Sequence, residues 1–182
     1  MRIEVGDMLF VAMDYQEKLM PSIQNREHIV KRSLLLMKCL RELHVPMIMT
    51  TQYSKGLGHN IREIRELIGD ENNFDKLTFS IYKNEHIKNY IDRQKKKFVV
   101  LAGAETHVCV LQSLIDLKAA GYVPVLVTDC SGSRDCEDRS IALKRAENEG
   151  VILTTAESLV CELYMTAAAP KFKKFLEIFK DQ

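Results

Sequence analysis

The sequence predicts a three-layer α/β/α domain with a mostly parallel, six-stranded sheet, and three observations lead to this fold class. Short uninterrupted apolar runs such as Met8–Met13 are typical of strands that are buried on both faces of a parallel sheet. Between these runs, apolar residues recur at helical spacing. No repeat, low-complexity segment or interdomain linker divides the 182 residues. We therefore expect a single domain over residues 1–182 whose strands and helices alternate.

Each expected element follows from its own pattern. The expected strands are Met8–Met13, Pro46–Thr51, Phe98–Leu101, Val123–Thr128 and Val151–Thr154, with Phe74–Ser80 either a short strand or an ordered loop. The expected helices are His28–Leu43, Ile61–Ile68, Asn84–Arg93, Glu105–Ala119, Glu137–Glu149, Ala156–Met165 and Pro170–Phe179. Lys55–His59, which contains two glycines, is predicted to be a flexible loop.

The expected strand order determines where a site would lie. In the Rossmann-like order 3-2-1-4-5-6, the first and fourth strands are neighbours, and ligands bind beyond the carboxyl ends of the strands where the order reverses. Asp14 directly follows the first strand, and Cys109 follows the fourth. We expect these two side chains to flank that point.

Composition argues against several classes of partner. Lysine and arginine number 26 against 25 acidic residues, a net charge of +1, which gives no electrostatic reason to expect nucleic acid or an anionic membrane as a partner. The densest basic run, Arg93–Lys97, is typical of a solvated turn. No apolar run approaches the ~18 residues of a membrane-spanning helix, and the N-terminus resembles neither a signal nor a transit peptide. A soluble, cytoplasmic protein is expected.

The five cysteines are scattered along the chain and form no C-x-x-C pair, which argues against a disulfide framework or a structural zinc site. Cys39, Cys130 and Cys161 are expected to be packing residues. Cys109 differs because it falls in the first turn of a predicted helix that opens from a strand, with Gly103 at the turn. The helix dipole there would favour a thiolate. The alternative is that Cys109 is one more buried, inert cysteine.

Three motifs together resemble the isochorismatase-like cysteine hydrolase family. They are Val11-Ala-Met-Asp-Tyr-Gln16, Phe74-Asp-Lys-Leu-Thr-Phe-Ser80 and Gly103-Ala-Glu-Thr-His-Val-Cys-Val110. The segment Thr50-Thr-Gln-Tyr-Ser-Lys-Gly-Leu-Gly58 also resembles a loop of a poorly characterised, metal-free branch of that family. The resemblance implies a catalytic triad of Asp14, Lys76 and Cys109. It further implies a cis peptide bond at Ala104–Glu105 and an oxyanion hole formed by the backbone N–H groups of Glu105 and Cys109.

The same resemblance implies hydrolysis of a small molecule, at a non-peptide C–N bond of the amide or ureide type, through a cysteine thioester. Metal-dependent nicotinamidases of the superfamily carry an Asp-x-His pair where this chain has Thr51-Gln52-Tyr53, so no metal or other cofactor is expected. The presence of Cys109 argues against isochorismate cleavage, because members with that activity lack the nucleophilic cysteine.

Other residues near these motifs have two interpretations each. Gln16, Gln52 and Tyr53 are candidate pocket residues, although they could equally cap loops or pack. The side chain of Glu105 could be a second acid in the site, but it is expected to interact with the helix dipole. His107 could be a base, but it is expected to be solvated or hydrogen-bonded.

The resemblance also implies a homo-oligomer, a dimer or larger, in which the apolar segment Phe172–Phe179 could cover a neighbouring subunit. Two alternatives to an enzyme stay open. One is a thiol- or redox-responsive protein in which Cys109 is modified without turnover, and the other is a catalytically silent protein-interaction module.

Overall fold

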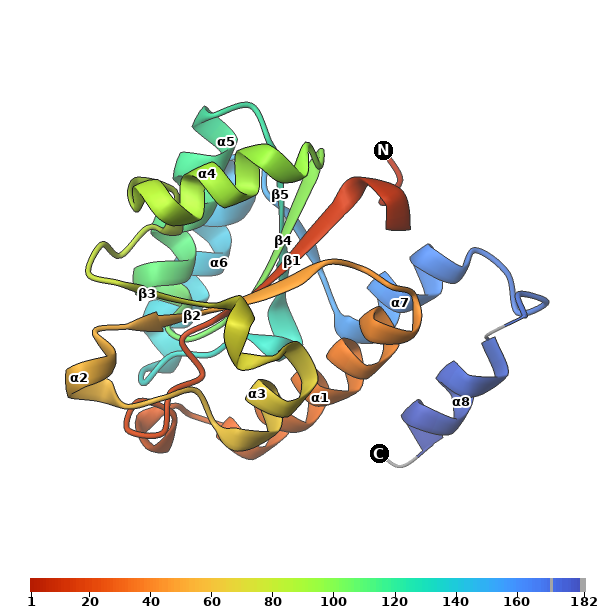
Figure 1. Cartoon of the computed structure of the whole chain (residues 1–182), viewed down its shortest axis with the longest axis horizontal. Helices are drawn as coiled ribbons and strands as arrows, with labels where there is room; N and C mark the ends of the chain where they lie inside the picture. The colour runs from red at the N-terminus through yellow and green to blue at the C-terminus, as the bar shows by residue number, and fades with distance from the viewer. Residues whose placement is uncertain (171, 181–182) are drawn as a thin grey trace.

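The structure, a computed structural model, describes residues 1–170 and 172–180 (Figure 1). Across these residues six parallel strands form one sheet in the order β3-β2-β1-β4-β5-β6. The strands are β1 (Met8–Met13), β2 (Met47–Gln52), β3 (Asn73–Lys76), β4 (Phe98–Gly103), β5 (Val123–Val127) and β6 (Ile152–Thr154). The predicted fold class and strand order are confirmed.

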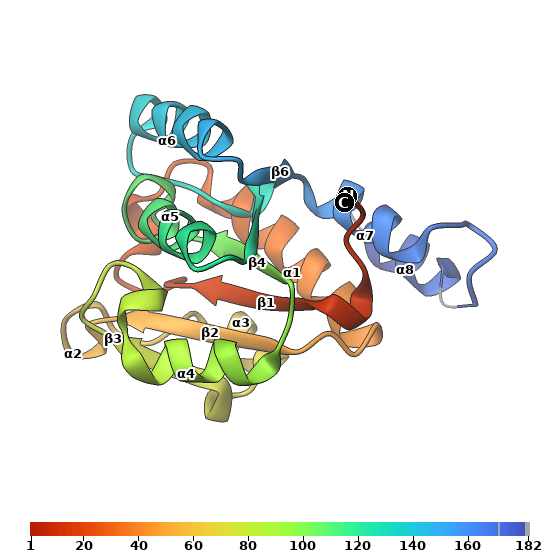
Figure 2. The same cartoon turned by 90° about the horizontal axis from the view of Figure 1, so that it is seen from above.

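Helices cover both faces of the sheet (Figures 1 and 2). One layer contains α1 (Arg26–Glu42), α3 (Arg62–Ile68), α7 (Ala156–Tyr164) and α8 (Phe172–Lys180), and the other contains α4 (Glu85–Gln94), α5 (Leu111–Ala119) and α6 (Cys136–Asn148). Short 3-10 turns occupy Val5–Asp7, Met20–Ser22, Asp70–Asn72, Ile81–Lys83 and Thr128–Cys130. Within the described ranges, no helix combines the length and apolarity that crossing a bilayer requires.

The central strand β1 explains why its sequence is apolar without interruption. Met8, Phe10 and Ala12 pack into the layer of α1 and α7, whereas alternate residues pack into the layer of α4 and α5. Every residue of β1 is fully buried, since both of its faces and both of its edges are covered. Complete burial of one large apolar side chain contributes about 1.5–3 kcal/mol, so this strand anchors the site that begins at its carboxyl end.

The structure corrects two local predictions and resolves a third that was left open. The predicted flexible loop Lys55–His59 overlaps the short helix α2 (Ser54–Leu57). The predicted helix over 105–119 is divided, because Thr106–Val110 forms a π-helical turn before α5 begins. The segment Phe74–Ser80, expected to be a strand or an ordered loop, contains both, since β3 ends at Lys76 and a loop follows. Lys171, inside the predicted helix 170–179, lies outside the described residues.

The C-terminal helix α8 packs against its own chain. The side chains of Phe175 and Phe179 are buried in the same core as α1, with the Arg32 guanidinium 5.1 Å from the centre of the Phe179 ring. Lys174 forms an ion pair with Glu42 at 2.8 Å. Two aromatic side chains of the segment that could cover a neighbouring subunit are therefore buried within the chain, whereas Leu176 on the same helix is exposed.

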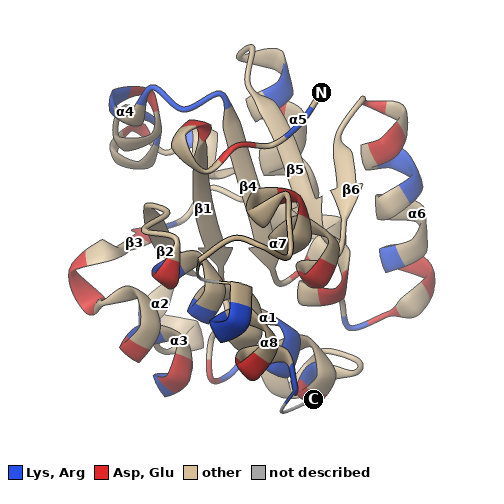
Figure 3. Ribbon diagram, turned by 90° about the vertical axis from the view of Figure 1, so that its right-hand side faces the viewer, with Lys and Arg blue, Asp and Glu red and all other residues tan. Residues whose placement is uncertain are grey.

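The basic run Arg93–Lys97 lies at the edge of the sheet where the strands begin. It connects the end of α4 to Phe98, the first residue of β4 (Figure 3). Because the carboxyl ends of the parallel strands lie at the opposite edge, this charge is separated from Asp14 and Cys109 by the length of a strand.

Candidate active site

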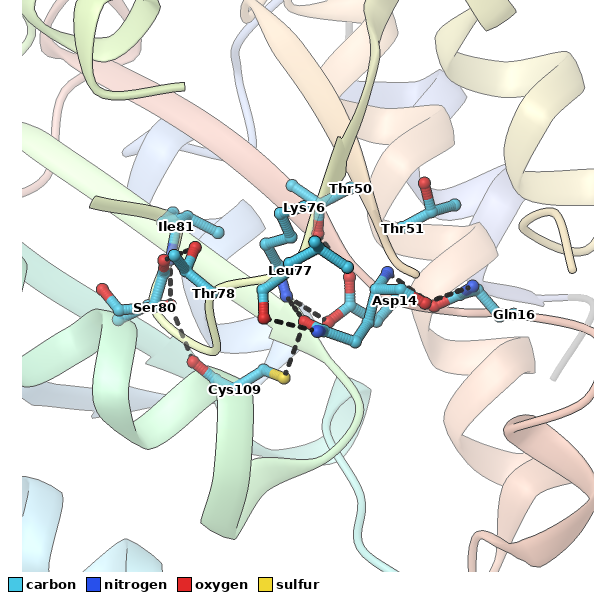
Figure 4. Close-up of polar contacts among 12 residues, drawn as sticks. Asp14, Gln16, Thr50, Thr51, Lys76, Leu77, Thr78, Ser80, Ile81 and Cys109 are labelled. Carbon is cyan, nitrogen blue, oxygen red and sulfur yellow. Dashed lines mark hydrogen bonds and ion pairs between the residues drawn. The ribbon is translucent and has the colours of Figure 1, made fainter. Parts of the chain in front are cut away.

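Three strand ends bring Asp14, Lys76 and Cys109 together (Figure 4). Asp14 directly follows β1, Lys76 is the last residue of β3, and Cys109 lies in the π-helical turn after β4. The Nζ atom of Lys76 lies 2.8 Å from Oδ2 of Asp14, and neither side chain is exposed to solvent. The sheet order produces this meeting, because Lys76 pairs in register with Gln52 of β2 and reaches past it toward β1.

Asp14 is fixed by backbone and side-chain contacts. Its φ of 55° lies in the left-handed region, which aspartate tolerates better than most residues. Its N–H donates to the carbonyl oxygen of Thr50 at 3.1 Å, and the Thr50 hydroxyl donates to Oδ1 at 2.6 Å. Thr50 and Lys76 thus each donate to a different carboxylate oxygen. Thr50 was not predicted as a site residue, because a hydroxyl within a buried strand has no distinctive signal in the sequence.

Gln52 links the lysine to the thiol. Its Oε1 accepts a hydrogen bond from Nζ of Lys76 at 2.7 Å and is 3.7 Å from Sγ of Cys109. Its Nε2 donates to the carbonyl oxygen of Leu77 at 3.0 Å, which fixes the orientation of the amide. Gln52 was a candidate pocket residue, and the structure places it between two members of the expected triad.

Cys109 is buried, with only 6 % of its surface exposed. Burial, followed by the charge of Asp14, raises its pKa to about 12, and the opposing effect of Lys76 is smaller. The helix dipole was expected to favour the thiolate, whereas burial and the charge of Asp14 act in the opposite direction and favour the thiol. The physical reason is that desolvation and a facing carboxylate outweigh the partial charge of one helical turn.

The turn from Gly103 to Thr106 leaves one backbone donor unused. Gly103 has a φ of 143°, and a Cβ there would lie 2.0 Å from the carbonyl oxygen of Met13, so glycine is required. The Ala104–Glu105 peptide bond is cis. The N–H groups on either side are occupied, that of Ala104 by Met13 at 3.0 Å and that of Thr106 by Gly132 at 2.9 Å. The Glu105 N–H donates to no group in residues 1–170 or 172–180.

The side chain of Glu105 is bound by Arg134, contrary to the expected interaction with the helix dipole. Nε of Arg134 donates to Oε1 at 2.9 Å and Nη2 donates to Oε2 at 2.6 Å, a bidentate pair. These hydrogen bonds are the main reason that the pKa of Glu105 lies below its ordinary value. A bidentate guanidinium satisfies a buried carboxylate more completely than the end of a helix does.

The remaining candidates have different surroundings. Gln16 is fully buried and its amide bonds the loop that follows β2, donating to the carbonyl oxygens of Gln52 and Gly58 at 3.1 and 2.8 Å. It therefore supports the loop that follows β2, which is one of the two roles expected for it. Tyr53 is 51 % exposed, and its ring lies against Gly56. His107 is hydrogen-bonded through Nδ1 to Ser133 at 2.9 Å, as expected.

The other predicted packing cysteines differ in their burial. Cys39 and Cys130 are buried as expected, whereas Cys161 is exposed, so its prediction as a packing residue is wrong. Over the described ranges, no three His, Cys, Asp or Glu side chains gather in a way that could hold a metal ion.

Comparison with known proteins identifies the family. The sequence-family model of the isochorismatase domain matches residues 8–158 of this chain. The chain belongs to the isochorismatase family. It is 35 % identical to isochorismatase family protein 1B of Dictyostelium discoideum over 179 residues, which are 96 % of this chain and 86 % of the relative. The resemblance inferred from the three motifs is therefore confirmed.

Two further matches define the extent of this similarity. Isochorismatase domain-containing protein 1 of Salmo salar is 36 % identical over 94 % of this chain, which spans only 60 % of that relative. The solved structure of the MAR1 ribonuclease from Caenorhabditis elegans superposes with a TM-score of 0.92 at 34 % identity, covering 99 % of this chain and 93 % of the other. This chain thus shares the fold of the isochorismatase-like hydrolases over nearly its whole length.

Proposed function

We propose that this protein is a cofactor-independent cysteine hydrolase that cleaves a non-peptide C–N bond of a small amide or ureide. The observation that carries the proposal is the single hydrogen-bonded cluster in which Asp14, Lys76 and Gln52 surround the thiol of Cys109. A buried acid, a buried cation and a thiol at a strand edge are the groups that nucleophilic acyl transfer requires.

In the first step Cys109 attacks the substrate carbonyl carbon. Because the pKa of the resting thiol is raised to about 12, the nucleophile forms only when its proton leaves during the attack. Asp14 is the base in this proposal, since its carboxylate faces the sulfur and raises that pKa. Lys76, whose Nζ lies 2.8 Å from Oδ2 of Asp14, compensates first the aspartate and then the negative charge that develops in the site.

The tetrahedral oxyanion then needs donors. The N–H of Glu105, which is unused within the described chain, and the N–H of Cys109 are the proposed pair. Each such backbone donor is worth about 10²–10³ in rate. When the C–N bond breaks, Asp14 returns its proton to the leaving amine, and the acyl group remains on sulfur as a thioester. Water then attacks the thioester, again through an oxyanion, and releases the acid.

Specificity is assigned to the residues around this cluster. Tyr53 and Leu77 are large apolar side chains with exposed fractions of 51 % and 73 %, and their backbones meet at the ends of β2 and β3. The N–H of Tyr53 donates to the carbonyl oxygen of Lys76 at 2.9 Å, so both side chains are tied to the catalytic edge. We infer that they form one wall of the substrate site.

A screen of small amides and ureides tests the proposal, with the Cys109→Ala variant as the blank. Cys136→Ala is the matched control, because Cys136 is an exposed cysteine outside the cluster. The expected result is ammonia or amine release that survives Cys136→Ala and disappears in Cys109→Ala. Release that persists without Cys109 would contradict the proposed mechanism. Stoichiometric modification of Cys109 without turnover would favour a thiol-responsive protein.

A nuclease activity is the second candidate, because a similar solved structure is described as a ribonuclease. The charge distribution argues against it, since Arg93–Lys97 lies where β4 begins (Figure 3), at the edge of the sheet opposite the carboxyl ends of the strands. Binding of a single-stranded RNA oligonucleotide should then be weak and should lack a steep dependence on salt. Cleavage that is lost in Cys109→Ala would instead establish this second function.

The homo-oligomer is also kept as a prediction. Light scattering coupled to size-exclusion chromatography should give a mass at least twice the 20.9 kDa of the chain. A monomeric mass would contradict it.

A further inference from the structure

The segment Ser131–Arg134 runs alongside the turn that presents the free Glu105 N–H. Gly132 both donates to the carbonyl oxygen of Gly103 at 3.1 Å and accepts from the N–H of Thr106 at 2.9 Å. The hydroxyl of Ser131 accepts from the N–H of Gly103 at 3.2 Å and donates to Val127 at 2.9 Å. The turn is therefore held against a second backbone on both sides of Glu105.

Arg134 completes this contact at the Glu105 side chain itself. The carboxylate accepts three hydrogen bonds from this one residue: from Nε at 2.9 Å, from Nη2 at 2.6 Å and from the backbone N–H at 3.1 Å. Glu105 is only 5 % exposed. A carboxylate that is so poorly solvated needs a charged partner to remain in place, and Arg134 is the partner that the structure gives it.

We propose that Arg134 is a positioning residue for the hydrolysis: it holds the Glu105 side chain so that the Glu105 N–H stays directed at the oxyanion, and it neutralises a carboxylate that would otherwise oppose the oxyanion charge. This inference rests on the proposed function, because it assigns a role within the same site. It adds a residue that the three sequence motifs do not contain.

Two consequences separate positioning from general stabilisation. Acylation of Cys109 passes through a tetrahedral oxyanion and depends on the Glu105 N–H. Alkylation of the same sulfur by iodoacetamide is a direct displacement at carbon and forms no oxyanion. If Arg134 acts only through Glu105, its loss slows the first reaction and spares the second. A residue that merely stabilises the fold would change both reactions together.

The experiment compares Arg134→Gln with the wild type in both reactions. Acylation is followed by release of p-nitrophenolate from p-nitrophenyl acetate, and alkylation by mass spectrometry of the peptide that contains Cys109. We expect acylation to fall about 10²-fold, the scale of a misplaced catalytic group, with alkylation changed less than about twofold. Arg62→Gln is the matched control, since Arg62 forms an exposed pair with Glu66, and it should leave both rates unchanged.

Two additional variants test the charge and the geometry separately. Arg134→Lys keeps the charge but loses the planar fork, so acylation should fall by about tenfold. Adding Glu105→Gln to Arg134→Gln removes the uncompensated carboxylate, and acylation should recover by about tenfold relative to Arg134→Gln alone. The melting temperatures of both variants are measured alongside, so that a poorly folded Arg134→Gln is recognised.

The outcomes distinguish this inference from the proposed function. Unchanged acylation in a folded Arg134→Gln, or an equal loss of acylation and alkylation, would overturn the positioning role while leaving Cys109 the nucleophile. A wild-type protein in which p-nitrophenyl acetate never acylates Cys109 would overturn both.

Discussion

Two regions of this molecule contain the same three kinds of group, and only one of them is arranged for chemistry. At the end of β1, Asp14 and Lys76 meet Cys109. At the end of β5, Asp129 forms an ion pair with Arg32 at 2.9 Å, and Cys130 is the next residue. In both regions burial is the main cause of a raised cysteine pKa, and a neighbouring carboxylate raises it further.

The difference lies in which groups remain available. Oδ2 of Asp129 accepts a hydrogen bond from Arg32, and Oδ1 accepts one from the N–H of Ala156 at 2.8 Å. The carboxylate therefore joins α1 to the start of α7. Cys130 has no exposed surface. Cys109 is slightly exposed and follows a turn with an unused N–H at Glu105. Residue types alone do not make a site; a reachable nucleophile with a free donor nearby does.

The largest expected effect distinguishes the two thiols. Cys109→Ala should abolish amide turnover, a loss of about 10⁵–10⁶ in kcat, which is the scale for removing a catalytic nucleophile. Cys130→Ala should leave kcat within about twofold and lower the free energy of unfolding by about 1–2 kcal/mol, because it leaves a small cavity. Steady-state kinetics and urea denaturation measure the two. Equal kinetic losses would remove the distinction.

The next prediction concerns the two carboxylates. Asp14→Asn should lower kcat by about 10³–10⁴, since the base and proton carrier is lost. Asp129→Asn should leave kcat nearly unchanged and should shift the melting temperature downward. A faster turnover in Asp14→Asn would show that the carboxylate only suppresses the thiol.

The two cations should separate the regions by stability. Lys76→Met leaves the Asp14 carboxylate buried and unpaired, so the free energy of unfolding should fall by about 3–5 kcal/mol. Arg32→Met should cost less, about 1–3 kcal/mol, because Asp129 retains the N–H of Ala156. Chemical denaturation at pH 7 measures both, and a smaller loss for Lys76→Met than for Arg32→Met would contradict the buried-pair argument.

The last prediction concerns how the rate of Cys109 alkylation depends on pH. Because the pKa of Cys109 is about 12, its thiolate fraction rises with pH across the whole accessible range. Alkylation of Cys109 by iodoacetamide should therefore increase about tenfold for each pH unit from 7 to 10, with no plateau. In Asp14→Asn the raising charge is absent, so the same rate should be higher at every pH. A plateau near neutral pH in the wild type would show a resting thiolate.

Much of this architecture is predictable from the sequence, because apolar patterning determines which segments are buried. The run Met8–Met13 and the residues that follow each strand were enough to place Asp14 and Cys109 at the carboxyl edge. The site role of Lys76 was predicted only from its motif, because a lysine at the end of a strand is usually solvated.

What could not be predicted depends on contacts between distant segments. The pair of Glu105 with Arg134 joins residues 29 positions apart, and nothing in either local pattern indicates it. The protonated state of Cys109 depends on burial and on the facing Asp14, which local helix position cannot reveal. For Gln16 the sequence left a pocket and a loop cap as equal alternatives, and only its tertiary hydrogen bonds to the loop after β2 favour the second.

The most direct test of the central claim is to trap the acyl-enzyme. The protein is mixed with p-nitrophenyl acetate and quenched in acid, and peptide mass spectrometry locates the acetyl group. We expect acetylation at Cys109 that forms rapidly, decays by hydrolysis and is strongly reduced in Asp14→Asn. Acetylation confined to the exposed Cys136 and Cys161, or a burst that persists in Cys109→Ala, would contradict it.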